Sequence, residues 1–113
     1  MMVSMATDPH RLAEARSLAA HQLIAARLAD EPELLEMARE RVASWLEDRS
    51  VARAYAEAWR DLLARDVAGI AVAIIDPSEH GRALRQCTPF AGALDPRTRW
   101  RLWASVREQL ETP

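Results

Sequence analysis

The chain has 113 residues, half of them hydrophobic, and its 15 basic and 17 acidic side chains leave a formal charge of −2. This length predicts one domain, and this charge argues against binding nucleic acid through bulk electrostatics. One cysteine excludes a disulfide within the chain, and three glycines beside 22 alanines argue against an all-β fold. The apolar run Val67–Ile75 is about half as long as a membrane span, which needs roughly 20 residues. We therefore expect a cytoplasmic protein that does not insert into membranes.

The first helix is predicted from Asp8-Pro9, because aspartate is a good N-cap and proline suits the first helical position. We expect it to run to about Asp30, after a flexible N-terminus at residues 1–7. Arg16 and Arg27 fall on the same side of this helix, since 11 residues make about three turns. Their aliphatic stems could cover the edge of the core, or the pair could face a partner as arginine anchors.

Two amphipathic helices are predicted next. One begins at Asp30, where Asp30 and Glu33 form a capping-box pattern. The other covers about Val51–Arg65 and begins after Ser50, a candidate cap. Each has an apolar stripe at helical spacing, and the connection between them is short, which favours an antiparallel hairpin. The stripe residues are Leu34, Ala38, Val42 and Trp45 in the first, and Val51, Tyr55, Trp59 and Leu62 in the second.

Three further segments follow. Asp66 is predicted to cap Val67–Ile75, which we assign to helix because no second strand exists to pair with it. A helix without charge needs cover on most sides, so we expect it to lie centrally. Ser78 is predicted to cap a short helix to about Cys87. After a loop, Asp95-Pro96 repeats the first capping pattern and opens a last helix with a stripe of Trp100, Trp103, Val106 and Leu110.

These patterns together predict an all-α single domain over residues 8–110. It is a bundle of five to six helices with a hairpin and a central apolar helix. The residues expected in or beside the core are Trp45, Tyr55, Trp59, Ile70, Ile74, Trp100 and Trp103.

Charge is distributed unevenly along the chain. Residues 1–80 carry nine arginines against 14 acids, whereas residues 81–113 carry six arginines against three acids. The C-terminal part is therefore locally basic. A solvated helix face explains this, and docking against an acidic partner surface is the alternative.

No catalytic residue, metal ligand or cofactor is predicted. The pair Arg16 and His21 does have the Arg-x4-His spacing of a class of small all-helical bacterial ribonucleases. Histidine could act there as general acid–base while arginine stabilises the phosphate. On an ideal helix, however, the two side chains point about 140° apart. Another alternative is a transcriptional regulator. Such a protein needs a recognition helix with exposed polar side chains that contact DNA bases, but the last helix has tryptophans at those positions.

Several segments together resemble a bacterial family. They are Arg16–His21, Leu34–Arg39, Tyr55 with Trp59, and Ala83–Gly92. Over about residues 8–110 the chain resembles small helical proteins encoded beside nucleotidyltransferase-type toxins in toxin–antitoxin operons, most specifically at Arg82–Trp100. The resemblance implies an antitoxin or accessory partner that binds a cognate toxin encoded by a neighbouring gene, and it carries no catalytic motif. The sequence also leaves open whether the chain forms a homo-oligomer.

The predicted partner surface combines Arg16 and Arg27 of the first helix with Phe90 of the Thr88–Leu94 loop. Arginines offer planar donors for carboxylates, such as those that bind metal in a nucleotidyltransferase. Phe90 lies in a loop with little apolar pattern around it, and loops often carry function. It could equally fill one end of the bundle.

Overall fold

A computed structural model describes residues 8–111, which contain six helices and no strand. The predicted all-α class is therefore confirmed, whereas residues 1–7, the predicted flexible N-terminus, lie outside the described residues. In chain order the helices are α1 Pro9–Arg27, α2 Glu33–Asp48, α3 Arg53–Leu63, α4 Val67–Ala73, α5 Glu79–Gln86 and α6 Pro96–Glu111.

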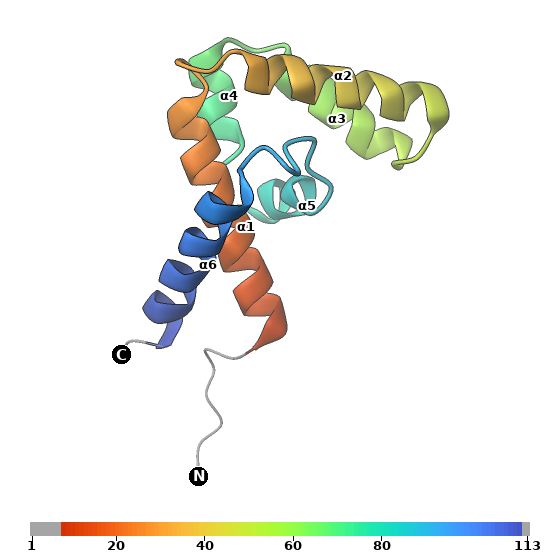
Figure 1. The fold of residues 1–113 in the computed structure, drawn as a ribbon. Helices are drawn as coiled ribbons and strands as arrows, with labels where there is room; N and C mark the ends of the chain where they lie inside the picture. The colour runs from red at the N-terminus through yellow and green to blue at the C-terminus, as the bar shows by residue number, and fades with distance from the viewer. Residues whose placement is uncertain (1–7, 112–113) are drawn as a thin grey trace.

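The helices form two pairs joined by a small central layer (Figure 1). α1 and α6 pack against each other, and α2 and α3 form the predicted antiparallel hairpin, which extends to one side. α4 and α5 connect the pairs, because each contacts both α1 and α3. The described molecule is accordingly elongated, with a longest dimension of 51 Å.

Short polar side chains begin most of the helices as predicted. Asp8 accepts a hydrogen bond from the amide of His10 at 3.0 Å, and Asp66 accepts one from Gly69 at 2.8 Å. Ser78 and Asp95 do the same at the starts of α5 and α6. These bonds satisfy amides that have no partner within the helix.

Two predicted caps are wrong. α2 begins at Glu33 after Pro32, with no side-chain cap from Asp30, because proline suits a helix start and moves it beyond Asp30. α1 accordingly ends at Arg27, and two turn amides bond back to its carbonyl. Ser50 does not cap α3, since its own amide donates to Asp48 and the helix begins after Ala52.

The core is built by buried apolar residues from α1 to α5 and from the 88–94 loop. Trp59, Ile70 and Ile74 are almost wholly inaccessible to solvent, as predicted. Trp59 also donates its indole N–H to the carbonyl oxygen of Leu84 at 3.1 Å, which satisfies its one polar atom. Trp45 packs against the core from α2, and Trp103 is half-buried.

Two residues predicted in the core are exposed: Tyr55 at 41% and Trp100 at 74%. Tyr55 lies in the first turn of α3, next to the connection between α2 and α3. Val106, a member of the predicted stripe of α6, is buried, and Leu102, which is not a member, packs against the core. The predicted stripe is therefore buried in part, and Trp100 lies outside the buried face.

α4 is covered on one face only. Ile70 and Ile74 are buried against the core, but Val67 is 39% exposed and Val72 is 70% exposed. The expectation that this uncharged helix is covered on most sides is wrong. A helix of seven residues needs only one buried stripe to be held in place.

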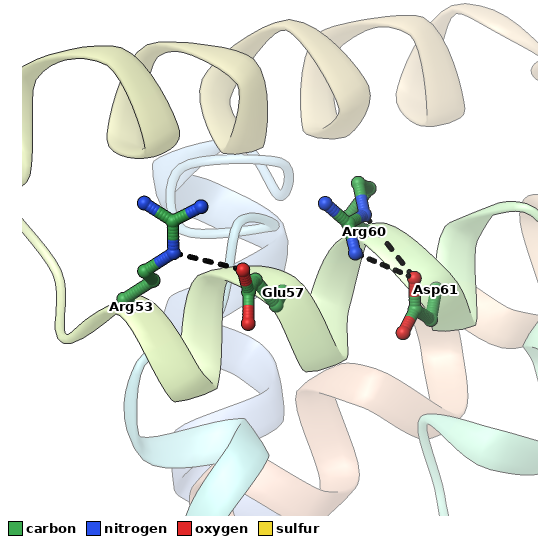
Figure 2. A network of polar contacts seen from close by, with 4 residues as sticks. All are labelled: Arg53, Glu57, Arg60 and Asp61. Carbon is green, nitrogen blue, oxygen red and sulfur yellow. Dashed lines mark hydrogen bonds and ion pairs between the residues drawn. The ribbon is translucent and has the colours of Figure 1, made fainter.

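The hairpin surface carries its own charge pairs (Figure 2). On α3, Arg53 donates to Glu57 at 2.9 Å, and Arg60 pairs with Asp61 at 3.1 Å. Exposed pairs of this kind add little stability, but they leave these arginines already engaged with carboxylates.

Candidate protein-binding face

A groove of about 590 Å³ follows the outer side of α6 where α1 packs beside it. We call it the α1–α6 groove; its lining residues are Arg16, Trp100, Trp103, Ala104, Arg107, Glu108 and Glu111. Those from α6 recur at i, i+3, i+4, i+7, i+8 and i+11, so they form one continuous stripe of the helix. Only Arg16 comes from α1.

Arg16 is held against an aromatic ring in this groove. Its guanidinium carbon lies 5.7 Å from the centre of the Trp103 ring, a cation–π contact. Its Nε atom is buried and has no hydrogen-bond partner. Arg16 is thus held beside the ring of Trp103, a contact that the sequence did not predict.

Trp100 is the most exposed large hydrophobic side chain of residues 8–111, at 74%. Trp103, three residues later in α6, lies on the same stripe. The sequence pattern placed Trp100 in the core, so its exposure was not predicted. The exposed neighbours Arg99 and Arg101 gave no signal, because arginines border a buried helix stripe as readily as an exposed one.

The N-terminal half of α6 is basic. Arg97, Arg99 and Arg101 are exposed, and none has a carboxylate oxygen within 4 Å among the described residues. In contrast, Arg53 and Arg60 of α3 each pair with a carboxylate. The two acids of the groove, Glu108 and Glu111, lie at its other end.

Arg27 lies outside the α1–α6 groove. It is 11 residues from Arg16, about 16 Å along the helix, and its Nε is 3.8 Å from a carboxylate oxygen of Glu31. It also lies close enough to the start of α6 to help lower the pKa of Asp95, which falls mainly through the Thr98 amide hydrogen bond. Arg27 therefore stands beside the start of α6.

Phe90 is buried, with 2% of its surface exposed, so its predicted contact with a partner is wrong. Its ring meets those of His21 and Trp59 edge-on, at centroid distances of 6.2 and 6.1 Å. Phe90 fills a space inside the bundle, whereas the alternative interpretation had placed it at one end. An apolar ring gains more from this enclosed site than from solvent.

The loop that carries Phe90 is held by an arginine of α2. The guanidinium of Arg41 donates to the carbonyl oxygens of Pro89 and Ala91, at 3.1 and 2.6 Å. These two bonds satisfy loop carbonyls on either side of Phe90. The role of Arg41 could not be predicted from the sequence, because nothing local in α2 indicates a partner 48 residues away.

His21 is buried beside Phe90 and is 3% exposed. Its Nδ1 lies 2.7 Å from the carbonyl oxygen of Ser17, so this nitrogen donates. Its Nε2 lies 2.8 Å from the Thr88 hydroxyl and accepts from it in the neutral ring. Desolvation is the main cause that lowers the pKa of His21, and positive Arg85 lowers it further, against the Ser17 bond.

Both ring nitrogens of His21 are thus occupied by residues of the fold, while Arg16 contacts Trp103 in the α1–α6 groove. The structure does not bring the two residues of the Arg-x4-His pattern together on a common site. It connects His21 to the 88–94 loop instead.

We expect stability to fall as the pH drops from 7 to 5. The folded state keeps His21 neutral, whereas the unfolded chain takes up a proton near the ordinary pKa of 6.5. Each pH unit below that value should cost up to about 1.4 kcal/mol until the folded pKa is reached. Urea unfolding at several pH values measures this.

The control for that titration is His80→Gln, because His80 is exposed and its replacement should keep the pH dependence. His21→Gln should be less stable at pH 7 and should lose most of the slope. A slope that is the same in the parent and in His21→Gln would show that another group is responsible.

Among residues 8–111, no three His, Cys, Asp or Glu side chains lie grouped so that they could hold a metal ion. In the same range, no helix combines the length and the apolar character that crossing a membrane requires. No family model, curated protein or solved structure matches the chain.

Proposed function

We propose that the chain is a protein–protein interaction module of the antitoxin type, which binds and neutralises a cognate toxin encoded by a neighbouring gene. The observation that supports this most is the exposed Trp100 beside Trp103 and Arg16 in the α1–α6 groove. Tryptophan and arginine are the residues most enriched among those that dominate binding energy at protein interfaces.

Energetics favour a covered Trp100. A tryptophan buries about 150–250 Å² in an interface, and apolar surface gains about 25 cal/mol per Å² on leaving water. Trp100 has most of this area exposed in the free chain. Its truncation should therefore cost a complex about 2 kcal/mol or more, which is roughly a 30-fold loss of affinity.

The charges of this face favour a partner that presents carboxylates. Arg16 and the arginines of early α6 offer planar donors, which fit carboxylates in a two-bond geometry. Arg27 would extend the same surface toward the start of α6. The metal-binding carboxylates of a nucleotidyltransferase-type toxin, implied by the family resemblance, are acceptors of this kind.

A growth assay tests the proposal. Expression of the neighbouring gene alone should arrest growth, and co-expression of this chain should restore it. Trp100→Ala should fail to restore growth, whereas Tyr55→Ala, which removes another exposed ring, should restore it fully.

The same assay separates the ribonuclease alternative. Under the proposal, the chain expressed by itself is harmless. Growth arrest by the chain alone, relieved by Arg16→Ala, would contradict an antitoxin role and favour catalysis by this protein.

A further inference from the structure

We infer that the α1–α6 groove takes an acidic amphipathic segment of a partner protein, whose carboxylate binds Arg16 and whose apolar side chain covers Trp100. This inference rests on the proposed function, because it names the chemistry of the partner at the same face. It is carried by three features: the orientation of Arg16, the unpaired arginines of α6, and the acids at one end of the groove.

Arg16 is arranged as a carboxylate receptor. The cation–π contact with Trp103, at 5.7 Å from the ring centre, holds the guanidinium group at the groove, so less conformational freedom is lost when a ligand binds. Nε is buried, so an incoming carboxylate would have to bind the two terminal nitrogens, and no described carboxylate oxygen lies within 4 Å of the group. Glu14, two residues earlier on α1, is directed to Arg82 instead, with an Nε–O distance of 3.8 Å.

The arginines of α6 set the direction in which such a segment would lie. Arg97, Arg99 and Arg101 make the N-terminal half of the helix positive, whereas the other end of the groove has two acids, Glu108 and Glu111, beside one arginine, Arg107. A bound segment should therefore place its acidic end near Arg97 and its neutral or basic end near Glu111. Complementary charge of this kind selects the partner and its orientation more than it adds affinity.

Nucleic acid fits the same groove less well. Glu108 and Glu111 line it, and their carboxylates would repel a phosphate backbone. The whole chain also carries a net charge of −2, which opposes the counterion release that drives such binding. An acidic polypeptide needs only a local basic patch beside an apolar surface.

A binding titration on the full chain tests the inference without any toxin. The probe is a fluorescein-labelled peptide of about 16 residues with leucines on one helix face and glutamates on the other; the control peptide has glutamine for every glutamate. At low salt the glutamate peptide should bind at least about tenfold more tightly than the glutamine peptide.

Variants locate the binding. Arg16→Ala and Trp100→Ala should each weaken the glutamate peptide about tenfold or more. Arg60→Ala and Tyr55→Ala should bind like the parent, since they remove an arginine and an exposed ring from the hairpin. Arg16→Lys should also bind more weakly. Lysine keeps the positive charge but lacks the planar guanidinium group, which can donate two hydrogen bonds to one carboxylate. Circular dichroism melts confirm that each variant is folded.

Three results would overturn the inference. The two peptides could bind equally well; a 20-nucleotide poly-dT strand could bind more tightly than the glutamate peptide; or light scattering could show a dimer that Trp100→Ala dissolves. The first removes the role of charge, the second favours nucleic acid, and the third shows that a second copy covers the groove. If the neighbouring protein fails to bind while the glutamate peptide does, the antitoxin role fails and the groove chemistry stands.

Discussion

Trp59→Ala is expected to lower the free energy of unfolding by about 3–5 kcal/mol, the usual range for removing a buried tryptophan. Trp59 is fully buried and contacts Phe90 edge-on. Truncation leaves a cavity at the point where α3 meets α5 and the 88–94 loop. It also removes one hydrogen bond to the Leu84 carbonyl oxygen, which keeps the bond from the Cys87 amide. Urea unfolding followed by circular dichroism measures the loss.

Trp59→Phe separates the two contributions. It keeps most of the apolar volume but removes the indole N–H, so the loss should be smaller, with about 1 kcal/mol from the lost hydrogen bond to Leu84. Tyr55→Ala, on the same helix, should change stability little because the ring is 41% exposed. A loss at Trp59→Ala no larger than at Tyr55→Ala would mean that this core is wrongly described.

Phe90→Ala should also cost about 3–5 kcal/mol, because the ring is enclosed by His21 and Trp59. The cavity would also loosen the loop that Arg41 and Thr88 hold, so amide hydrogen exchange in the 88–94 loop should become faster. Thermal unfolding and hydrogen exchange measure the two effects.

Phe90→Leu is the matched variant, since it retains apolar volume and should lose less stability than Phe90→Ala. A different result would contradict the burial of Phe90. Unchanged stability in Phe90→Ala, together with a loss of partner binding, would return Phe90 to the surface role that the sequence suggested.

Most of the fold followed from local patterns. Asp8, Asp66, Ser78 and Asp95 were readable as caps because each accepts from an amide only two or three residues away. Helical spacing of apolar residues predicted the helices for the same reason. Pro32 shows the limit of such reasoning, because two competing start signals stood within three residues and the proline determined the boundary.

The orientation of helix faces was harder to predict. On α6, the predicted stripe included Trp100 and left out Leu102, yet Leu102 packs against the core and Trp100 is exposed. The long stems of arginine can border either a buried or an exposed stripe, so charge did not resolve the choice. Which stripe is buried depends on the partner helix α1, and the sequence of α6 does not contain that information.

The candidate site was found only in part for a related reason. Helical spacing was enough to select Arg16 as a candidate. Its contact with Trp103 could not be predicted in this way, because the two residues lie near opposite ends of the chain. The bond from His21 to Thr88 spans 67 residues. Arg85 is a further example: it is 6% exposed, and its guanidinium donates to the carbonyl oxygens of Ile74 and Asp76 after α4. A charged residue on a short helix predicts exposure unless those carbonyls are known to be beside it.

The most direct test of the proposed function is a calorimetric titration of this chain with the purified product of the neighbouring gene. We expect a stoichiometric complex that Trp100→Ala weakens about 30-fold and that Tyr55→Ala leaves unchanged. The absence of a complex, or a complex that Trp100→Ala binds as tightly as the parent, would contradict a partner-binding role for the α1–α6 groove.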